Sequence, residues 1–219
     1  MENSRIREMA SEAVRASIEL AASSTELKNN ALGCIAESLM AYKDEIIKAN
    51  QEDLERSKKE NISAPLLKRL KFDETKIKDV VSGIYSLIKL EDPVGKVLMQ
   101  TKLDDGLELY KISCPIGVIG IIFESRPDAL VQISTLCLKS GNSVLLKGGS
   151  EARETNRILA EIILQATKKA GIPDGWIQLL ETRADVNEML KMDEYIDLII
   201  PRGSNEFVRY IMDNSRIPV

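Results

Sequence analysis

The chain has 219 residues, with 30 Lys and Arg against 34 Asp and Glu and a formal net charge of −4. This balance leaves no broad cationic face for a nucleic-acid backbone, so nucleic acid is not an expected partner. Hydrophobic residues make up 44% and charged residues 29%, which is typical of a globular chain rather than a disordered one. The longest apolar run, Ile116 to Phe123, is shorter than the roughly twenty residues that span a bilayer. No leader sequence opens the chain, so we expect no membrane segment and a cytoplasmic location.

Histidine is absent and there are only three cysteines. Ser-His-Asp catalysis, Cys-His catalysis and His-ligated zinc are therefore excluded from this chain. Cys34, Cys114 and Cys137 form no CxxC pair, so we expect neither a disulfide framework nor a bound metal. Cys34 and Cys137 fall on apolar helical patterns and are interpreted as core residues. None of the three lies beside an activating base, so none is a good candidate for a nucleophile.

The first third of the chain has the pattern of amphipathic helices. Apolar residues recur at three- and four-residue steps between residues 2 and 22, which predicts one buried stripe. Ser23 and Glu26 have the spacing of a capping box and predict the start of a second helix. A third helix is expected after Ser63, because the proline that follows is tolerated in a first turn. A fourth is expected over residues 73–88.

Two short runs, residues 97–103 and 107–112, flank an Asp-Asp-Gly sequence that ends at Gly106. An Asp-Gly pair tolerates the positive φ angles of a tight turn, so the pattern predicts a β-hairpin. An isolated hairpin is marginally stable. We therefore expect this one to lie against something else, such as another subunit.

From Pro115 onward, buried strands alternate with helices. The expected strands cover residues 116–123, 143–147, 176–181 and 196–200, and the expected helices cover 128–140, 151–170, 184–192 and a segment ending at 214. Repeated strand–helix units with short links predict a parallel sheet with right-handed crossovers and helices on both faces. The expected fold class is α/β: a Rossmann-like parallel sheet with an N-terminal helical segment and a projecting β-hairpin.

In an open parallel sheet the ligand lies beyond the carboxyl ends of the strands. Three loops are expected there, at residues 124–128, 147–150 and 201–204. Two of them combine glycine, a hydroxyl and a cation at a helix N-terminus, a combination that favours phosphate. Taken singly, each such loop is more readily explained as a structural turn. The full GxGxxG motif is absent, and Gly117 and Gly120 are interpreted as close-packing positions.

Three stretches carry a resemblance to a known family: Glu-Ser-Arg-Pro at 124–127, Lys-Gly-Gly at 147–149 and Ile-Pro-Arg-Gly at 200–203. Over essentially its whole length the chain resembles the γ-glutamyl phosphate reductases (glutamate-5-semialdehyde dehydrogenases) of the aldehyde dehydrogenase superfamily. The resemblance implies a homo-oligomeric enzyme that reduces L-glutamyl 5-phosphate to L-glutamate 5-semialdehyde with NADPH in proline biosynthesis. In this family a cysteine thiolate displaces phosphate, and hydride then reduces the thioester.

The resemblance also implies cofactor roles. Lys147 matches the superfamily lysine that holds the adenosine ribose hydroxyls, and Gly203 and Ser204 match the Gly-Ser turn at the pyrophosphate. NAD-preferring members often have a glutamate three residues after that lysine, whereas this chain has Ser150, which favours NADPH over NADH. Arg153, one turn further on, is expected to reach the 2′-phosphate. The alternative is that Ser150 only caps the helix and Arg153 lies in solvent. The expected NADP-binding set is Lys147, Gly148, Gly149, Ser150, Arg153, Gly203 and Ser204.

Two substrate residues follow from the same comparison. Ser125 stands where general aldehyde dehydrogenases have an oxyanion-hole asparagine, so it is a candidate oxyanion donor with a shorter, rotating hydroxyl. Arg126 is a candidate bidentate partner for the phosphate or carboxylate of the substrate. The loss of the asparagine argues against a third reading, a general aldehyde oxidase of the same superfamily.

Finally, the resemblance implies that the chain consists of three parts. Residues 1–93 are expected to be the N-terminal helical part of the cofactor-binding domain, 94–114 the oligomerisation hairpin and 115–219 the Rossmann-like NADP-binding core. The nucleophilic cysteine of the family would lie beyond Val219, in a catalytic domain absent from this chain. We therefore expect the chain alone to be inactive. The alternative reading is a stand-alone nucleotide-binding or interaction module without catalysis.

Overall fold

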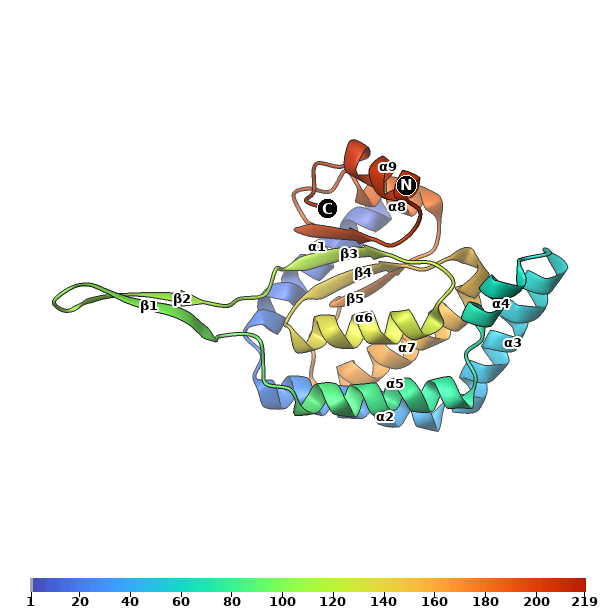
Figure 1. The fold of residues 1–219 in the computed structure, drawn as a ribbon, viewed down its shortest axis with the longest axis horizontal. Coiled ribbons are helices and arrows are strands. Elements are labelled where there is room, and N and C mark those ends of the chain that lie inside the picture. The colour runs from blue at the N-terminus through green and yellow to red at the C-terminus, as the bar shows by residue number, and fades with distance from the viewer. Residues whose placement is uncertain (1) are drawn as a thin grey trace.

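In the computed structural model, which describes residues 2–219, a run of helices precedes the sheet. They are α1 (Glu2–Ala21), α2 (Thr25–Ala41), α3 (Lys43–Lys59), α4 (Ala64–Leu70) and α5 (Glu74–Lys89), shown in Figure 1. The expected helices are all present, with boundaries within a few residues of those predicted. The structure adds α3 as a complete helix.

The second helix starts one residue later than its capping box predicts. Ser24 is the N-cap of α2, and its hydroxyl accepts a hydrogen bond from the Leu27 N–H at 3.1 Å. The hydroxyl of Ser23 instead donates to the carbonyl oxygen of Glu19 in the last turn of α1, at 3.2 Å. The capping box proposed for Ser23 and Glu26 is therefore wrong, because the preceding helix engages that hydroxyl.

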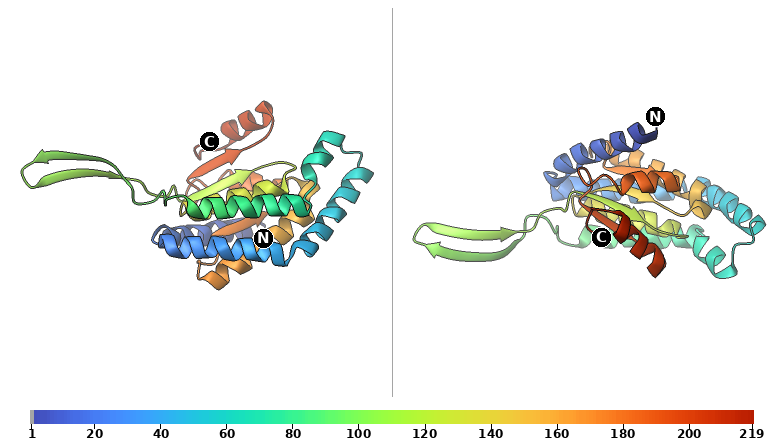
Figure 2. Two further views of the ribbon diagram at one scale, coloured as in Figure 1. Left: turned by 60° about the horizontal axis from the view of Figure 1, so that its bottom comes forward. Right: turned by 90° about the horizontal axis from the view of Figure 1, so that it is seen from above.

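A two-stranded antiparallel ribbon follows the helices. It consists of β1 (Val97–Asp104) and β2 (Leu107–Ile112), joined through Gly106 at φ +80°. Every residue of both strands is exposed, and Figures 1 and 2 show the ribbon projecting from the rest of the chain in each view. The predicted hairpin is confirmed, with both of its faces open.

The sheet contains β3 (Val118–Ile122), β4 (Ser143–Lys147), β5 (Ile177–Leu180) and β6 (Leu198–Pro201). These strands are parallel and lie in the order β5-β4-β3-β6. The helices among them are α6 (Pro127–Lys139), the short 3₁₀ helix η1 (Ser150–Ala152), α7 (Arg153–Ala170), α8 (Arg183–Met189) and α9 (Asn205–Asn214). All residues of β3 and β4 are buried, as expected for strands covered on both faces. The predicted α/β class is confirmed.

The central strand β3 begins two residues later than expected. Gly117 has φ +124°, which is outside the strand region of the backbone. The N–H groups of Ile116 and Gly117 donate to the side-chain oxygen of Asn142, at 2.7 and 2.9 Å. A side chain thus takes the place of a neighbouring strand at this end of β3.

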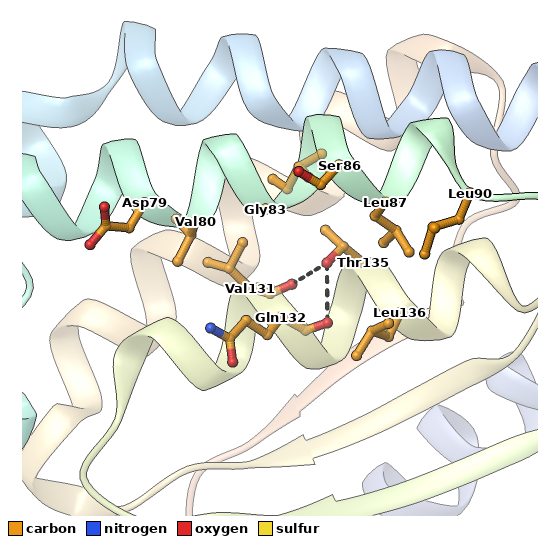
Figure 3. Close-up of a pocket in the computed structure, with 11 residues that line it drawn as sticks. Asp79, Val80, Gly83, Ser86, Leu87, Leu90, Val131, Gln132, Thr135 and Leu136 are labelled. Atoms are coloured by element: carbon orange, nitrogen blue, oxygen red, sulfur yellow. Dashed lines mark hydrogen bonds between the residues drawn. The ribbon is translucent and has the colours of Figure 1, made fainter.

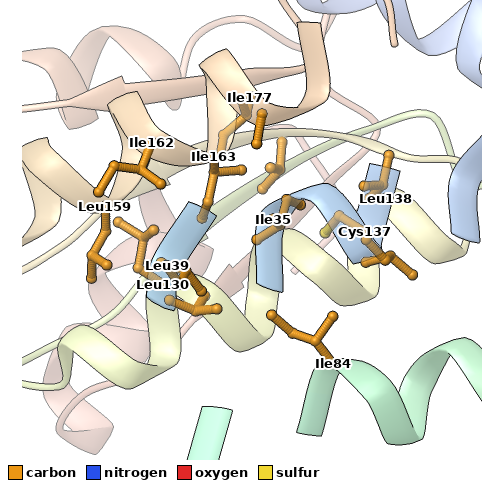
Figure 4. Packing of buried hydrophobic residues seen from close by; sticks show 14 of the residues in the cluster. Ile35, Leu39, Ile84, Leu130, Cys137, Leu138, Leu159, Ile162, Ile163 and Ile177 are labelled. Carbon is orange, nitrogen blue, oxygen red and sulfur yellow. The ribbon is translucent and has the colours of Figure 1, made fainter. Parts of the chain in front are cut away.

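Two clusters of buried side chains hold the layers together. On one face of the sheet, α6 and α7 pack with α2 and α5; Figure 4 shows Leu39 of α2 beside Leu130 of α6. On the other face, α1 and α8 bury a second cluster that includes Leu145. A Cβ added to Gly120 would lie 3.0 Å from the sulfur of Met189, so its interpretation as a close-packing position is confirmed.

Trp176, immediately before β5, is fully buried in the larger cluster. Its indole N–H donates to the hydroxyl of Thr167 in α7 at 3.0 Å, which satisfies the one polar atom of the ring. This bond ties α7 to the amino end of the sheet, opposite the ends where the candidate loops lie.

The cysteines occupy three different environments. Cys137 is 6% exposed in the core, and burial raises the pKa of its thiol to about 12. Cys34 is half-buried and packs against the same cluster, so both are core residues as interpreted. Cys114 is exposed.

Over residues 2–219, no helix combines the length and apolar character needed to traverse a bilayer.

Candidate cofactor site

A cleft of about 890 Å³ lies at the carboxyl ends of β3 and β4. The loop after β3 and the loop after β4, both singled out from the sequence, line it side by side. Its remaining walls come from α4, α8, α9 and the turn after β5. The side chains and glycines that line it are Ile62, Leu66, Ile122, Phe123, Glu124, Ser125, Lys147, Gly148, Gly149, Ser150, Glu151, Glu181, Thr182, Arg183, Val186, Asn187, Phe207 and Tyr210.

Lys147, the last residue of β4, places its ammonium group in this cleft while only 8% of the residue is exposed. The group donates a hydrogen bond to the carbonyl oxygen of Gly148. Burial lowers the pKa of Lys147, and the nearby charge of Glu151 acts in the opposite direction. A partly desolvated ammonium attracts polar ligands more strongly than one in bulk water.

Gly148 and Gly149 bring bare backbone to the cleft wall. A Cβ on Gly148 would collide with the side-chain amide of Asn156, and one on Gly149 would collide with the carboxylate of Glu151. Asn156 is 3% exposed, and its side-chain oxygen is buried without a hydrogen-bond partner. Sequence reasoning missed Asn156, because an asparagine on a helix of mixed composition carries no distinguishing signal.

Ser150 and Arg153 lie at the entrance to α7. Ser150 is exposed, and Arg153 donates to Glu154 at 2.8 Å with 54% of its side chain exposed. The first amides of α7 are not capped by Ser150. Asp53 of α3 accepts from the N–H groups of Glu154 and Thr155, at 3.2 and 2.8 Å.

Side chains of α3 hold the loop after β4 in place through hydrogen bonds. Asp53 is fully buried and pairs with Arg56. Arg56 also donates to the backbone oxygens of Ser150 and Glu151, at 3.1 and 3.2 Å. An Asp and an Arg three positions apart on a charged helix look like solvated surface in the sequence, which is why this support was missed.

Ser125 also lines the cleft, in the loop after β3. It is 5% exposed and has φ +39°, an unusual value for a residue with a side chain. Its backbone N–H donates to Oε1 of Glu151 at 2.7 Å, and its hydroxyl donates to the same oxygen. Both donors of the candidate oxyanion residue are therefore directed at a carboxylate of the neighbouring loop.

Arg126, Gly203 and Ser204 lie next to the cleft rather than in its walls. Arg126 and Gly203 line a smaller neighbouring cavity, and Arg126 forms an ion pair with Asp128 at 2.7 Å. The hydrogen bond to Asp128 raises the pKa of Arg126. The Ser204 hydroxyl accepts from the Phe207 N–H at 3.2 Å and caps α9. The structure thus brings Ser125 together with Lys147–Ser150 and leaves these three residues at the border.

A different kind of cavity, of about 360 Å³, lies between α5 and α6 (Figure 3). Val80, Leu87 and Leu136 line it, and the hydroxyl of Thr135 is engaged by carbonyl oxygens of its own helix. Within the described part of the chain, Asp79 is the one charged residue of this lining. An apolar groove with a single carboxylate does not suit a nucleotide phosphate.

Comparison with known proteins gives a consistent result. Residues 2–218 match the aldehyde dehydrogenase family. The γ-glutamyl phosphate reductase of Acetivibrio thermocellus is 77% identical over 214 residues, which cover 98% of this chain and 50% of that protein. The corresponding protein of Pelotomaculum thermopropionicum is 74% identical, over 98% of this chain and 49% of its own length.

Solved structures agree with the fold. The crystal structure of γ-glutamyl phosphate reductase from Thermotoga maritima matches with a TM-score of 0.94 and 36% identity, covering 98% of this chain and 52% of that one. The Saccharomyces cerevisiae enzyme matches with a TM-score of 0.92 and 42% identity, over 98% and 55% of the two chains. The chain therefore spans about half the length of the relatives it matches. It belongs to the aldehyde dehydrogenase family and is a homologue of γ-glutamyl phosphate reductase.

Proposed function

We propose that this chain is the cofactor-binding half of an NADPH-dependent γ-glutamyl phosphate reductase, which converts L-glutamyl 5-phosphate to L-glutamate 5-semialdehyde in proline biosynthesis. The identity of 77% over nearly the whole chain supports this assignment. The observation that carries it is the cleft itself, in which the loops after β3 and β4 meet at the carboxyl ends of parallel strands.

The residues of the cleft fit a dinucleotide. One N–H of the Lys147 ammonium group donates to the Gly148 carbonyl oxygen, which leaves two N–H donors for ribose hydroxyls. The two glycines leave no room for side chains, which would collide with Asn156 and Glu151, and Asn156, outside the cleft lining, has a buried oxygen that still lacks a donor. Lys147, Gly148, Gly149 and Ser150 would hold the adenosine end, with Gly203 and Ser204 at the pyrophosphate. When bound, the reduced nicotinamide supplies the hydride.

A preference for NADPH is supported by the residues at the entrance to α7. Ser150 is exposed and neutral, and Arg153 is close enough in sequence to offer a cation on the same turn. Arg56 adds a positive charge directly beneath the Ser150 carbonyl. A glutamate at position 150 would repel a 2′-phosphate, whereas serine does not.

The substrate side of the site is the loop after β3. Arg126 is a charged guanidinium with 43% of its side chain exposed, and it would hold an anionic group of the substrate. Ser125 would donate to the acyl oxygen only after one of its hydrogen bonds to Glu151 is released. The two loops therefore give the chain a cofactor side and a substrate side.

The chain alone is proposed to be catalytically inactive. In the part of the chain that the structure describes, no cysteine lines the cleft, and Cys137 is held as a thiol by its burial. A thiolate nucleophile would have to come from elsewhere. We also propose a homo-oligomer located in the cytoplasm, with the exposed hairpin of β1 and β2 contacting a second subunit.

Calorimetry on the 219-residue chain tests the proposal directly. We expect NADPH to bind, Lys147→Met to weaken binding at least about tenfold, and Lys191→Met to leave it unchanged. Lys191 is an exposed lysine paired with Glu188 outside the cleft. Absence of NADPH binding would refute the cofactor assignment.

Turnover separates the enzyme from a binding module. The chain alone should not reduce glutamyl phosphate, and the full-length natural product of its gene should do so with NADPH. If the full-length product binds NADPH but reduces no glutamyl phosphate, the alternative of a nucleotide-binding module is favoured instead.

A further inference from the structure

A second cavity at the carboxyl ends of the strands, the smaller one that Arg126 and Gly203 line, lies beside the cofactor cleft where β3 and β6 end. Its volume is about 360 Å³. It shares Phe123, Glu124 and Ser125 with that cleft, but none of the residues 147–151 reaches it. Its remaining apolar and backbone walls are Ala129, Pro201, Gly203 and Val208. The cavity is therefore on the far side of Ser125 from the proposed adenosine-binding loop.

Three arginines from three different elements line this cavity. Arg69 comes from α4, Arg126 from the loop after β3 and Arg202 from the turn after β6. The backbone N–H of Arg202 donates to the carbonyl oxygen of Ile122 at 2.8 Å, which holds the turn against the end of β3. Residues separated by more than 50 positions in the sequence thus converge on one small space.

The cavity has an excess of positive charge. Arg126 is paired with Asp128. Within residues 2–219, neither Arg69 nor Arg202 has an ion-pair partner, and both are exposed. Glu124 is the carboxylate of the lining, so three guanidinium groups face two carboxylates once Asp128 is counted. Like charges gathered without full compensation favour the entry of an anion.

We propose that Arg69, Arg126 and Arg202 form a phosphate site that takes the phosphoryl group of the acyl phosphate substrate. Guanidinium groups bind phosphate oxygens bidentately, and three of them from separate elements match a tetrahedral dianion. The assignment of the phosphate to the substrate rests on the proposed function. It extends the substrate site from Arg126 to Arg202, the cation of the loop 201–204, and to Arg69, which the sequence did not single out.

The site is separate from the proposed adenosine end of the cofactor. Lys147 and Ser150 line the larger cleft and not the smaller cavity, whereas Arg126 and Arg202 line the smaller cavity and not the larger cleft. Ser125 lines both, so a substrate with its phosphate among the arginines directs its acyl group toward the boundary with the cofactor cleft. The larger cleft, with about 890 Å³ against 360 Å³, is the one that suits a dinucleotide.

Thermal unfolding of the 219-residue chain in inorganic phosphate, against chloride at equal ionic strength, tests the site without any turnover. We expect phosphate to raise the midpoint of unfolding, because a ligand of the native state stabilises it. In Arg69→Gln/Arg202→Gln, the apparent Kd for phosphate should rise at least about tenfold. Arg209→Gln should keep the wild-type response, since Arg209 does not line this cavity.

NADPH affinity distinguishes the two sources of phosphate. The double variant should bind NADPH within about threefold of wild type. A parallel loss of NADPH affinity would assign the arginines to the cofactor pyrophosphate and overturn the proposal. A wild-type chain with no phosphate response, or a double variant with an unchanged one, would overturn it as well.

Kinetics on the full-length gene product complete the test. Arg69→Gln and Arg202→Gln should each raise KM for glutamyl phosphate at least about tenfold and leave KM for NADPH unchanged, and Arg→Lys at either position should recover part of the loss. If the product does not reduce glutamyl phosphate at all, the proposed function fails, while a phosphate response that depends on the arginines still establishes the anion site.

Discussion

One carboxylate oxygen of Glu151 accepts hydrogen bonds from both the backbone N–H of Ser125, at 2.7 Å, and its hydroxyl. The two residues belong to the loops that follow the neighbouring strands β3 and β4, and both line the cleft. Because Ser125 is nearly buried and has a positive φ, the contact compensates a backbone conformation that is otherwise unfavourable. The side chain of Glu151 therefore links the loop after β4 to the loop after β3.

Removing the hydrogen bonds between Ser125 and Glu151 should increase the local opening of the loop after β3. We expect Glu151→Ala to increase amide hydrogen exchange of the segment 123–127 by at least about tenfold, since the Ser125 N–H loses its acceptor. Glu151→Gln keeps an acceptor oxygen and should stay close to wild type. Glu181→Ala, which removes another carboxylate of the cleft, is the control. Equal exchange in Glu151→Ala and wild type would contradict the coupling of the two loops.

A second prediction concerns the ion pair between the buried Lys28 and the partly exposed Asp92, whose atoms Nζ and Oδ2 are 2.7 Å apart. Lys28 is 1% exposed, so Asp92→Asn leaves its ammonium buried beside a neutral group. We expect the free energy of unfolding, measured in urea, to fall by about 3 kcal/mol. Glu74→Gln removes the exposed carboxylate that pairs with Lys43 and Lys78 and should cost much less. Similar losses for the two variants would show that burial does not set the strength of the first pair.

Acid stability should depend on Asp185. Burial raises the pKa of this carboxylate, but hydrogen bonds from the Thr182 N–H, from Arg5 and from the Glu181 N–H outweigh it and lower the pKa overall. A lowered pKa in the folded state stabilises the protein above the ordinary aspartate value of about 4. That stabilisation is lost as the pH falls through the lowered value. The gap in unfolding free energy between wild type and Asp185→Asn should be constant near neutrality and should shrink below about pH 4. A gap that grows in acid would contradict the direction of this shift.

Cofactor choice is predicted to depend on position 150. Ser150→Glu adds a carboxylate at the exposed entrance to α7, where the 2′-phosphate is proposed to lie. NADPH affinity should fall about five- to 150-fold in calorimetry, while NADH affinity should be retained. Ser82→Glu adds the same charge on the exposed side of α5 and should change neither. If both cofactors lose affinity equally, the 2′-phosphate does not lie at Ser150.

The hairpin should affect assembly and not folding. Deletion of residues 98–112 removes strands that are exposed throughout. The backbone bonds between Gly95 and Ser113, at 2.9 Å, and between Ser113 and Lys96, at 2.9 Å, leave the chain ends adjacent at the root. The unfolding free energy of the chain should be unchanged within about 0.5 kcal/mol. Light scattering on the full-length gene product should show a smaller particle, and an unchanged mass would contradict an oligomerisation role.

The elements that the sequence predicted correctly have local signals. The Asp-Gly turn fixes the hairpin at Gly106, and the continuous apolar runs of β3 and β4 are typical of strands buried on both faces. The loops around Ser125 and Lys147 could be placed at one edge of the sheet for the same reason, because parallel strands end together.

The parts that escaped prediction depend on contacts between distant segments. Asn50, Asp53 and Ser57 form most of the buried face of α3, so that helix has no apolar stripe to detect. The contact between Ser125 and Glu151 joins residues 26 positions apart. Arg69 reaches the second cavity from a helix that shows only ordinary capping and composition. In each case the sequence shows which kind of side chain is present but not which distant residues it contacts.

Trp176 gives these experiments an internal optical probe. It is the one tryptophan of the chain and is fully buried at the amino end of β5, whereas the cleft lies at the carboxyl ends of the strands. Its emission should shift to longer wavelength when the core opens to water. A cofactor in the cleft can quench that emission by energy transfer but cannot touch the ring. Unfolding and NADPH occupancy can therefore be followed in the same cuvette, at the emission wavelengths of indole and of the reduced nicotinamide.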